Sequence, residues 1–191
     1  MIRVFDKVID LGKPVNRFTV VDLICPLRAW FAYNESIKEL VRSTDELVIM
    51  GVEIHSIVLS QLKEQGCDVE VPVEVEVECN GQKYVRRFRA DAVCGDKVIE
   101  VKRKYTKELA PLYIWQVKVY MALLGINKGA IISLLDGYVK EIEASEDELM
   151  AVKENFVNNI RKVLCGDVSR NIGKWCRYCK YRNICLNDRL I

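Results

Sequence analysis

Three side chains near the middle of the sequence have the types and the spacing that phosphodiester hydrolysis requires. Asp91 and Glu100 lie in the segment RADAVCGDKVIEVK, and Lys102 follows Glu100 by two residues, which places both on one face of a strand. Two carboxylates can hold Mg²⁺ or Mn²⁺, and a lysine can orient the attacking water or stabilise the developing negative charge. Surface strands rich in glutamate and lysine also produce this spacing by chance, so the pattern needs support from elsewhere in the chain.

Further polar side chains lie on two helices that the sequence predicts. His55, the only histidine, shares an apolar helix face with Leu59 and Leu62. It is therefore either a core residue or a neutral imidazole that supplies a nitrogen ligand to the same cation. Gln116 and Tyr120 are four residues apart and share one helix face. They form either a hydrogen-bonded pair or a contact to a phosphate or a nucleobase.

The eight cysteines divide into two groups by their spacing. Cys176 and Cys179 form a C-x-x-C unit and Cys185 follows, so three thiolates can hold one metal centre. A four-coordinate site lacks one ligand, and Cys25, directly before a proline, is the candidate fourth. Disulfides are a poor default in a chain without a secretion signal. The remaining cysteines are therefore interpreted as isolated core or surface residues: Cys67, Cys79, Cys94 and Cys165.

The elements that must position these side chains form one mixed α/β unit. Hydrophobic periodicity and turn residues predict helices over 22–34, 44–65, 111–124 and 145–164, and strands over 69–78, 83–92, 98–101, 130–135 and 138–142. Pro72 favours an edge position for the strand that contains it, and the tail from Gly166 onward is expected to be irregular.

Composition supports an ordered protein that is expected in the cytoplasm without a membrane partner. Hydrophobic residues make up 50% and charged residues 29%, which excludes general disorder. No apolar run approaches the roughly 20 residues of a membrane helix, and the first ten residues lack the apolar core of a signal peptide.

The net charge of +2 conceals three basic segments. From Arg161 to Arg182 there are seven basic residues and one acidic residue, and two further clusters run from Lys83 to Arg89 and from Lys102 to Lys107. Each segment is either a solvated face or part of a DNA path. Three aromatic residues interleave with the first segment, where they either stack bases or shield a metal centre from water: Trp175, Tyr178 and Tyr181.

The order of these motifs resembles that of the RecB-type nucleases of the PD-(D/E)XK superfamily. The motifs are His55, Asp91, Glu100-Val101-Lys102, and Gln116 with Tyr120. With Cys25 near the start and three cysteines near the end, the chain resembles the CRISPR-associated Cas-four exonucleases, and also the iron–sulfur nuclease domains of AddB-like repair proteins. One departure is that Arg89-Ala90 precedes Asp91 where the family often has glycine.

The resemblance implies a fold and a cofactor. The fold is a restriction-endonuclease-like core, with a central mixed sheet flanked by helices, in a single RecB-like domain over residues 1–191. An iron–sulfur region formed by about 20–35 and 166–191 would join the terminal segments. The cluster, 4Fe–4S in preference to 2Fe–2S, would be held by four cysteines: Cys25, Cys176, Cys179 and Cys185.

The resemblance also implies an activity: a Mg²⁺- or Mn²⁺-dependent deoxyribonuclease that acts mainly as an exonuclease on single-stranded DNA. Asp91, Glu100 and Lys102 would be catalytic; His55, Asp91, Glu100 and the Val101 carbonyl would hold the metal ion. Gln116 and Tyr120 would position the DNA.

The partners implied are single-stranded DNA or DNA overhangs and the CRISPR spacer integrase complex, because the family trims prespacers during CRISPR adaptation; a homo-oligomer is also allowed. Two alternatives stay open. One is a RecB- or AddB-type repair nuclease outside CRISPR. The other is a zinc-ribbon DNA-binding module without catalysis, which leaves Asp91, Glu100 and Lys102 unexplained.

Overall fold

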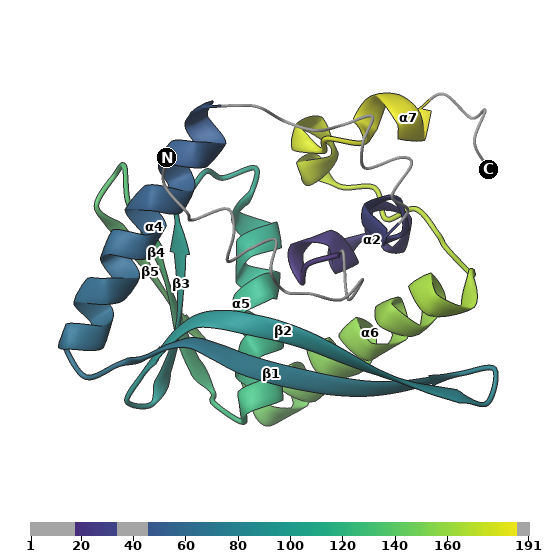
Figure 1. The fold of residues 1–191 in the computed structure, drawn as a ribbon, viewed down its shortest axis with the longest axis horizontal. Coiled ribbons are helices and arrows are strands. Elements are labelled where there is room, and N and C mark those ends of the chain that lie inside the picture. The colour runs from purple at the N-terminus through teal and green to yellow at the C-terminus, as the bar shows by residue number, and fades with distance from the viewer. Residues whose placement is uncertain (1–17, 34–45, 187–191) are drawn as a thin grey trace, which may run out of the picture.

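A five-stranded mixed sheet forms the centre of the protein in the computed structural model, which describes residues 18–33 and 46–186 (Figure 1). The strand order is β1-β2-β3-β4-β5, with β3 and β4 parallel and every other pair antiparallel. The strands are β1 (Asp68–Cys79), β2 (Gln82–Cys94), β3 (Lys97–Lys102), β4 (Lys128–Ser133) and β5 (Tyr138–Glu143). The predicted strands are therefore confirmed to within two residues at each end.

Helices cover both faces of this sheet. Helix α4 (Glu46–Glu64) packs on one face, where Leu59 contacts a small apolar cluster that includes Ile99 and Val101 (Figure 1). Helices α5 (Ala110–Leu124) and α6 (Glu146–Cys165) cover the other face and enclose the larger core around Val98, Ile131 and Phe156. The chain thus has the predicted α/β architecture, consistent with a restriction-endonuclease-like core.

The two ends of the described chain lie side by side. The first segment contains the 3-10 helix η1 (Val21–Ile24) and α2 (Pro26–Tyr33), and the last contains η2 (Lys174–Tyr178) and α7 (Arg182–Leu186) (Figure 1). The Leu27 amide donates to the Ser169 carbonyl at 3.1 Å, and Asn159 Nδ2 donates to the Leu23 carbonyl at 2.9 Å. The helix predicted over 22–34 is interrupted at Cys25, whose extended backbone separates η1 from α2.

Several local predictions agree with the structure. Strand β1, which contains Pro72, is an edge strand, and β3 is the central strand. Ser145 accepts the Glu148 amide at the start of α6, as expected for an N-cap. The tail contains two short helices instead of only irregular chain. The predictions for residues 44–45 and for the first ten residues lie outside the described residues.

In the described ranges, no helix combines the length and the apolar character that a membrane crossing requires.

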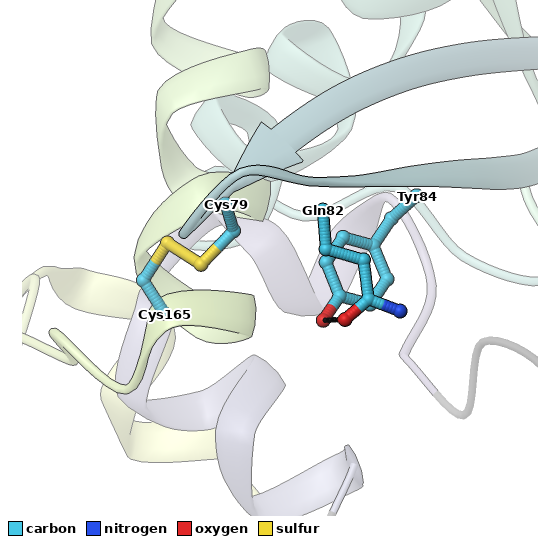
Figure 2. Close-up of a disulfide and its surroundings, with 4 residues drawn as sticks. All are labelled: Cys79, Gln82, Tyr84 and Cys165. Carbon is cyan, nitrogen blue, oxygen red and sulfur yellow. Dashed lines mark hydrogen bonds between the residues drawn. A yellow bond between two sulfur atoms is a disulfide. The ribbon is translucent and has the colours of Figure 1, made fainter.

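Two disulfides overturn the interpretation of four cysteines as isolated residues. Cys67 is bonded to Cys94, and Cys79 is bonded to Cys165. Figure 2 shows the second bond, which joins the end of β1 to the end of α6, with Gln82 and Tyr84 beside it. The partners are 27 and 86 residues apart, so local spacing carries no signal for either pair. The remaining four cysteines form no disulfide: Cys25, Cys176, Cys179 and Cys185.

Candidate functional site

The structure brings His55 on α4 to Asp91 on β2. The His55 Nε2 atom lies 3.0 Å from Asp91 Oδ2, and the same oxygen accepts the Val101 amide of β3 at 2.7 Å. Asp91 therefore connects the helix to the central strand through one carboxylate oxygen. His55 is 31% exposed at its side chain, so it is not the core residue that its apolar helix face also allowed.

Glu100 and Lys102 meet on β3 as their spacing predicted. Lys102 Nζ lies 2.6 Å from Glu100 Oε1, and Gln116 Nε2 on α5 donates to the same oxygen at 2.9 Å. Glu100 is 2% exposed, and burying an ionised carboxylate this completely costs free energy. Its second oxygen, Oε2, is buried and has no hydrogen-bond partner, and Gln116 Oε1 is in the same condition.

The pKa values at this site follow from burial and from neighbouring charges. Burial raises the pKa of Glu100 to about 7, even though the Lys102 ammonium opposes this shift. Burial also acts to raise the pKa of Asp91, but the hydrogen bond and charge of His55, the charge of Lys102 and the Val101 amide together outweigh it, so the pKa of Asp91 is lowered. The hydrogen bond to Asp91 raises the pKa of His55. For Lys102, the charges of Glu100 and Asp91 outweigh burial and raise the pKa.

Gln116 and Tyr120 lie behind Glu100 and away from the surface. They are 7% and 4% exposed. Burial raises the pKa of Tyr120, and the charges of Glu100 and Asp91 raise it further. Gln116 thus contacts the carboxylate and Tyr120 lies within reach of its charge, and their assignment as DNA-positioning residues stays a prediction.

Tyr113 is a further residue beside this site that the sequence reasoning missed. The Lys102 ammonium lies 5.0 Å from the centroid of the Tyr113 ring. Tyr113 precedes Gln116 by three residues, and this helical spacing is the signal that could have identified it.

The carboxylates of Asp91 and Glu100 are ligands that suit a hard cation. One oxygen of each is already hydrogen-bonded, Asp91 Oδ2 to the Val101 amide and Glu100 Oε1 to Lys102. Among the residues described, no three histidine, cysteine, aspartate or glutamate side chains are arranged to hold a metal ion. The buried, unpartnered Oε2 of Glu100 beside the Asp91 carboxylate is nevertheless the kind of oxygen that Mg²⁺ or Mn²⁺ satisfies. Metal binding by His55, Asp91, Glu100 and the Val101 carbonyl stays a prediction.

The four cysteines outside the disulfides line one pocket of about 600 Å³ between α2 and the tail. The Asn171 amide donates to Cys25 Sγ at 3.3 Å, and the Gly173 amide donates to Cys176 Sγ at 3.4 Å. Burial raises the pKa of Cys179, and the neighbouring Cys176 and Cys25 raise it further. Two of the four thiols thus accept backbone amides, as cluster ligands do, but among the residues described no three cysteines are arranged around one metal position, so the cluster stays a prediction.

The aromatic residues of the tail differ in exposure. Tyr181 is fully buried, and its ring lies 5.5 Å from that of Phe31, so it cannot stack a base. Trp175 Nε1 is buried as well, whereas Tyr178 is 53% exposed. For Tyr181 and Trp175 the structure favours shielding of the thiol pocket over DNA contact.

Comparison with known proteins agrees with this arrangement. The family model of the PD-(D/E)XK nuclease superfamily matches residues 53–143, which include the six polar residues that the sequence singled out on α4, β2, β3 and α5. The chain is similar to coat protein TP1 of Thermoproteus tenax virus 1 (strain KRA1), with 36% identity over 97 residues, covering 50% of this chain and 78% of that protein.

A solved structure extends the similarity beyond the matched segment. The crystal structure of SSO0001 superposes with a TM-score of 0.66 at 25% identity, covering 94% of this chain and 91% of that chain. The similarity therefore includes the segments on both sides of residues 53–143. The chain therefore carries a PD-(D/E)XK nuclease superfamily domain over residues 53–143, within a fold shared over nearly the whole chain.

Proposed function

We propose that the protein is a metal-dependent deoxyribonuclease that acts mainly as an exonuclease on single-stranded DNA. The observation that carries this proposal is Glu100, a buried carboxylate with one unpartnered oxygen, placed between Asp91 and Lys102. A fold that needed only stability would not bury an acidic group with an unsatisfied oxygen. The match of residues 53–143 to a nuclease superfamily supports the same function.

Each side chain of the site has a task that its contacts suggest. His55, Asp91, Glu100 and the Val101 carbonyl would hold Mg²⁺ or Mn²⁺, which neutralises phosphate charge and lowers the pKa of a bound water. Lys102 carries a positive charge 2.6 Å from Glu100 and can stabilise negative charge on the phosphate.

Gln116 donates to the same Glu100 oxygen as Lys102 and would hold that carboxylate in place. Because the Val101 amide donates to Asp91 Oδ2, the orientation of this second carboxylate is also set by the central strand.

The test of this activity is degradation of end-labelled single-stranded DNA with Mn²⁺, with Mg²⁺ and with a chelator. We expect cleavage only with metal, and labels at the 5′ and 3′ ends will give the polarity. Strands that stay intact with either metal, at protein concentrations that bind them, would overturn the proposal.

We further propose that the four cysteines outside the disulfides hold an iron–sulfur cluster that joins the two ends of the chain. The support is that all four line one pocket between α2 and the tail. Iron content and visible absorption of anaerobically purified protein test this. Cys25→Ser and Cys176→Ser should lose iron, whereas Cys67→Ser, a matched control at a disulfide cysteine, should keep it. A colourless protein with stoichiometric zinc would contradict the assignment.

The biological role that we propose is the trimming of prespacer overhangs during CRISPR adaptation, beside the spacer integrase, in the cytoplasm. The support is the combined order of the nuclease motifs and the four cysteines. Duplexes with single-stranded overhangs, offered with and without the integrase, test this role. Equal cleavage of overhangs and blunt ends, unaffected by the integrase, would favour a repair nuclease instead.

A non-hydrolytic role is the second candidate, because one relative is a viral coat protein with 36% identity over 97 residues. In that case the chain would bind nucleic acid without cutting it. The same degradation assay separates the two, since a coating protein protects labelled DNA and a nuclease shortens it.

A further inference from the structure

We propose that Tyr105, Tyr113 and Tyr138 form a stacking platform for the bases of single-stranded DNA next to the scissile phosphate. This inference rests on the proposed nuclease function and adds a substrate-binding surface to it. The three rings come from three different elements: the loop after β3, helix α5 and the first position of β5. Their sequence positions give no indication that they meet.

The rings form a continuous path that starts at the candidate catalytic lysine. The Lys102 ammonium, 2.6 Å from Glu100, also lies 5.0 Å from the centroid of the Tyr113 ring. The centroids of Tyr113 and Tyr105 are 6.5 Å apart, and those of Tyr105 and Tyr138 are 5.5 Å apart. Tyr113 and Tyr105 are partly buried, and Tyr138 is 46% exposed, so the path leads from the site to the surface.

Hydrogen bonds fix the loop that carries the middle ring. Ser133, fully buried at the end of β4, accepts the Tyr105 amide at 2.9 Å. The Leu134 and Leu135 amides donate to the carbonyls of Lys102 and Arg103 at 2.9 and 3.0 Å. Because the backbone is held on both sides, the platform is formed before any ligand arrives, and little conformational entropy is lost on binding.

The charge beside the rings is complementary to DNA. Arg103, Lys104 and Lys107 are exposed in the same loop, and within the described residues none of them forms an ion pair. Arg103 also lies close enough to Tyr113 for its positive charge to act toward a lower pKa of the phenol. Cations beside aromatic rings are the combination that binds single strands, in which phosphates contact the cations and bases stack on the rings.

Binding of a fluorescein-labelled oligothymidylate, measured by anisotropy without divalent metal, tests the platform. Tyr105→Ala and Tyr138→Ala should each weaken the Kd by roughly 5- to 150-fold, because stacking on a ring contributes about that much per base. Tyr105→Phe and Tyr138→Phe keep the ring and should bind like the parent. Tyr84→Ala, at a partly buried tyrosine on β2, is the matched control and should also bind like the parent.

Two further readouts separate stacking from charge. The tyrosine variants should keep the salt dependence of the parent, whereas Arg103→Gln with Lys104→Gln should lower the slope of log K against log salt by about 0.7 for each lost phosphate contact. An abasic oligonucleotide should bind parent and tyrosine variants equally.

The outcomes distinguish the platform from the function on which it rests. A parent that binds and cleaves DNA while both alanine variants keep its Kd would overturn the platform and leave the nuclease intact. A parent that neither binds nor cleaves single strands would overturn both proposals.

Discussion

Glu100 should make the metal-free protein less stable as pH rises, and Glu100→Gln should remove that dependence. Burial raises the pKa of this carboxyl from 4.5 to about 7. Between these values the folded protein keeps a proton that the unfolded chain has released. Because the folded state binds more protons there, the free energy of unfolding falls as pH rises. This contribution to stability is fully present below pH 4.5 and is lost as pH rises through about 7.

The size of the effect follows from the same values. One proton changes the free energy of unfolding by about 1.4 kcal/mol per pH unit. From pH 4.5 to about 7 the expected loss is therefore ~3 kcal/mol for a side chain that is only 2% exposed. His55 and Asp91 titrate in both proteins, so the difference between parent and Glu100→Gln reports on Glu100 together with the effect of its charge on His55 and Lys102.

Urea unfolding with a chelator present, repeated across this pH window, measures that difference. Glu154→Gln, at an exposed position of α6, is the matched control and should follow the parent. Saturating Mn²⁺ near pH 8 should restore the stability of the parent, because the ion binds the ionised carboxylate of the folded state. The same Mn²⁺ should raise the free energy of unfolding of Glu100→Gln much less. A parent-to-variant difference that stays constant from pH 4.5 to about 8 would refute the assignment of Glu100 as a buried carboxyl with a raised pKa.

Three other changes test separate parts of the structure. Replacing Cys79 and Cys165 with serine should cost about 4–5 kcal/mol of unfolding free energy, because the bond closes a loop of 86 residues; a reductant that leaves the urea midpoint of the oxidised parent unchanged would contradict this. Asn171→Ala should lower the iron content, since Asn171 Nδ2 donates to the Ile24 carbonyl at 2.6 Å and holds the segment beside the pocket; full iron occupancy would contradict it. His55→Ala should reduce Mn²⁺ affinity in calorimetry far more than Tm, and the reverse pattern would indicate a structural histidine.

Much of the fold could be predicted because local signals agree with the tertiary structure. Asn80-Gly81 identifies the tight turn between β1 and β2, and Ser145 with Glu148 identifies the start of α6. Glu100 and Lys102 were placed together by the two-residue period of a strand. These features depend on neighbours in sequence, which is why a single sequence reveals them.

Long-range features were not predictable in the same way. The disulfide from Cys67 to Cys94 forms because the end of β2 lies beside the residues that follow α4. The number of residues between the two cysteines does not predict this contact. The proximity of Tyr105 to Tyr138 depends on the parallel pairing of β3 with β4 and on the loop held by Ser133. The burial of Tyr181 against Phe31 likewise follows from the docking of the tail on α2, which its polar surroundings in the sequence concealed.

The most direct test of the nuclease site is the initial rate at which parent and Lys102→Ala shorten end-labelled single-stranded DNA in saturating Mn²⁺. Lys102 is the ammonium 2.6 Å from Glu100, and loss of a group that stabilises transition-state charge costs roughly 10²–10³-fold in rate. We predict at least that loss for Lys102→Ala, with folding and DNA binding retained, while Lys153→Ala on the exposed face of α6 keeps the parental rate. Cleavage by Lys102→Ala at the rate of the parent would contradict the assigned site.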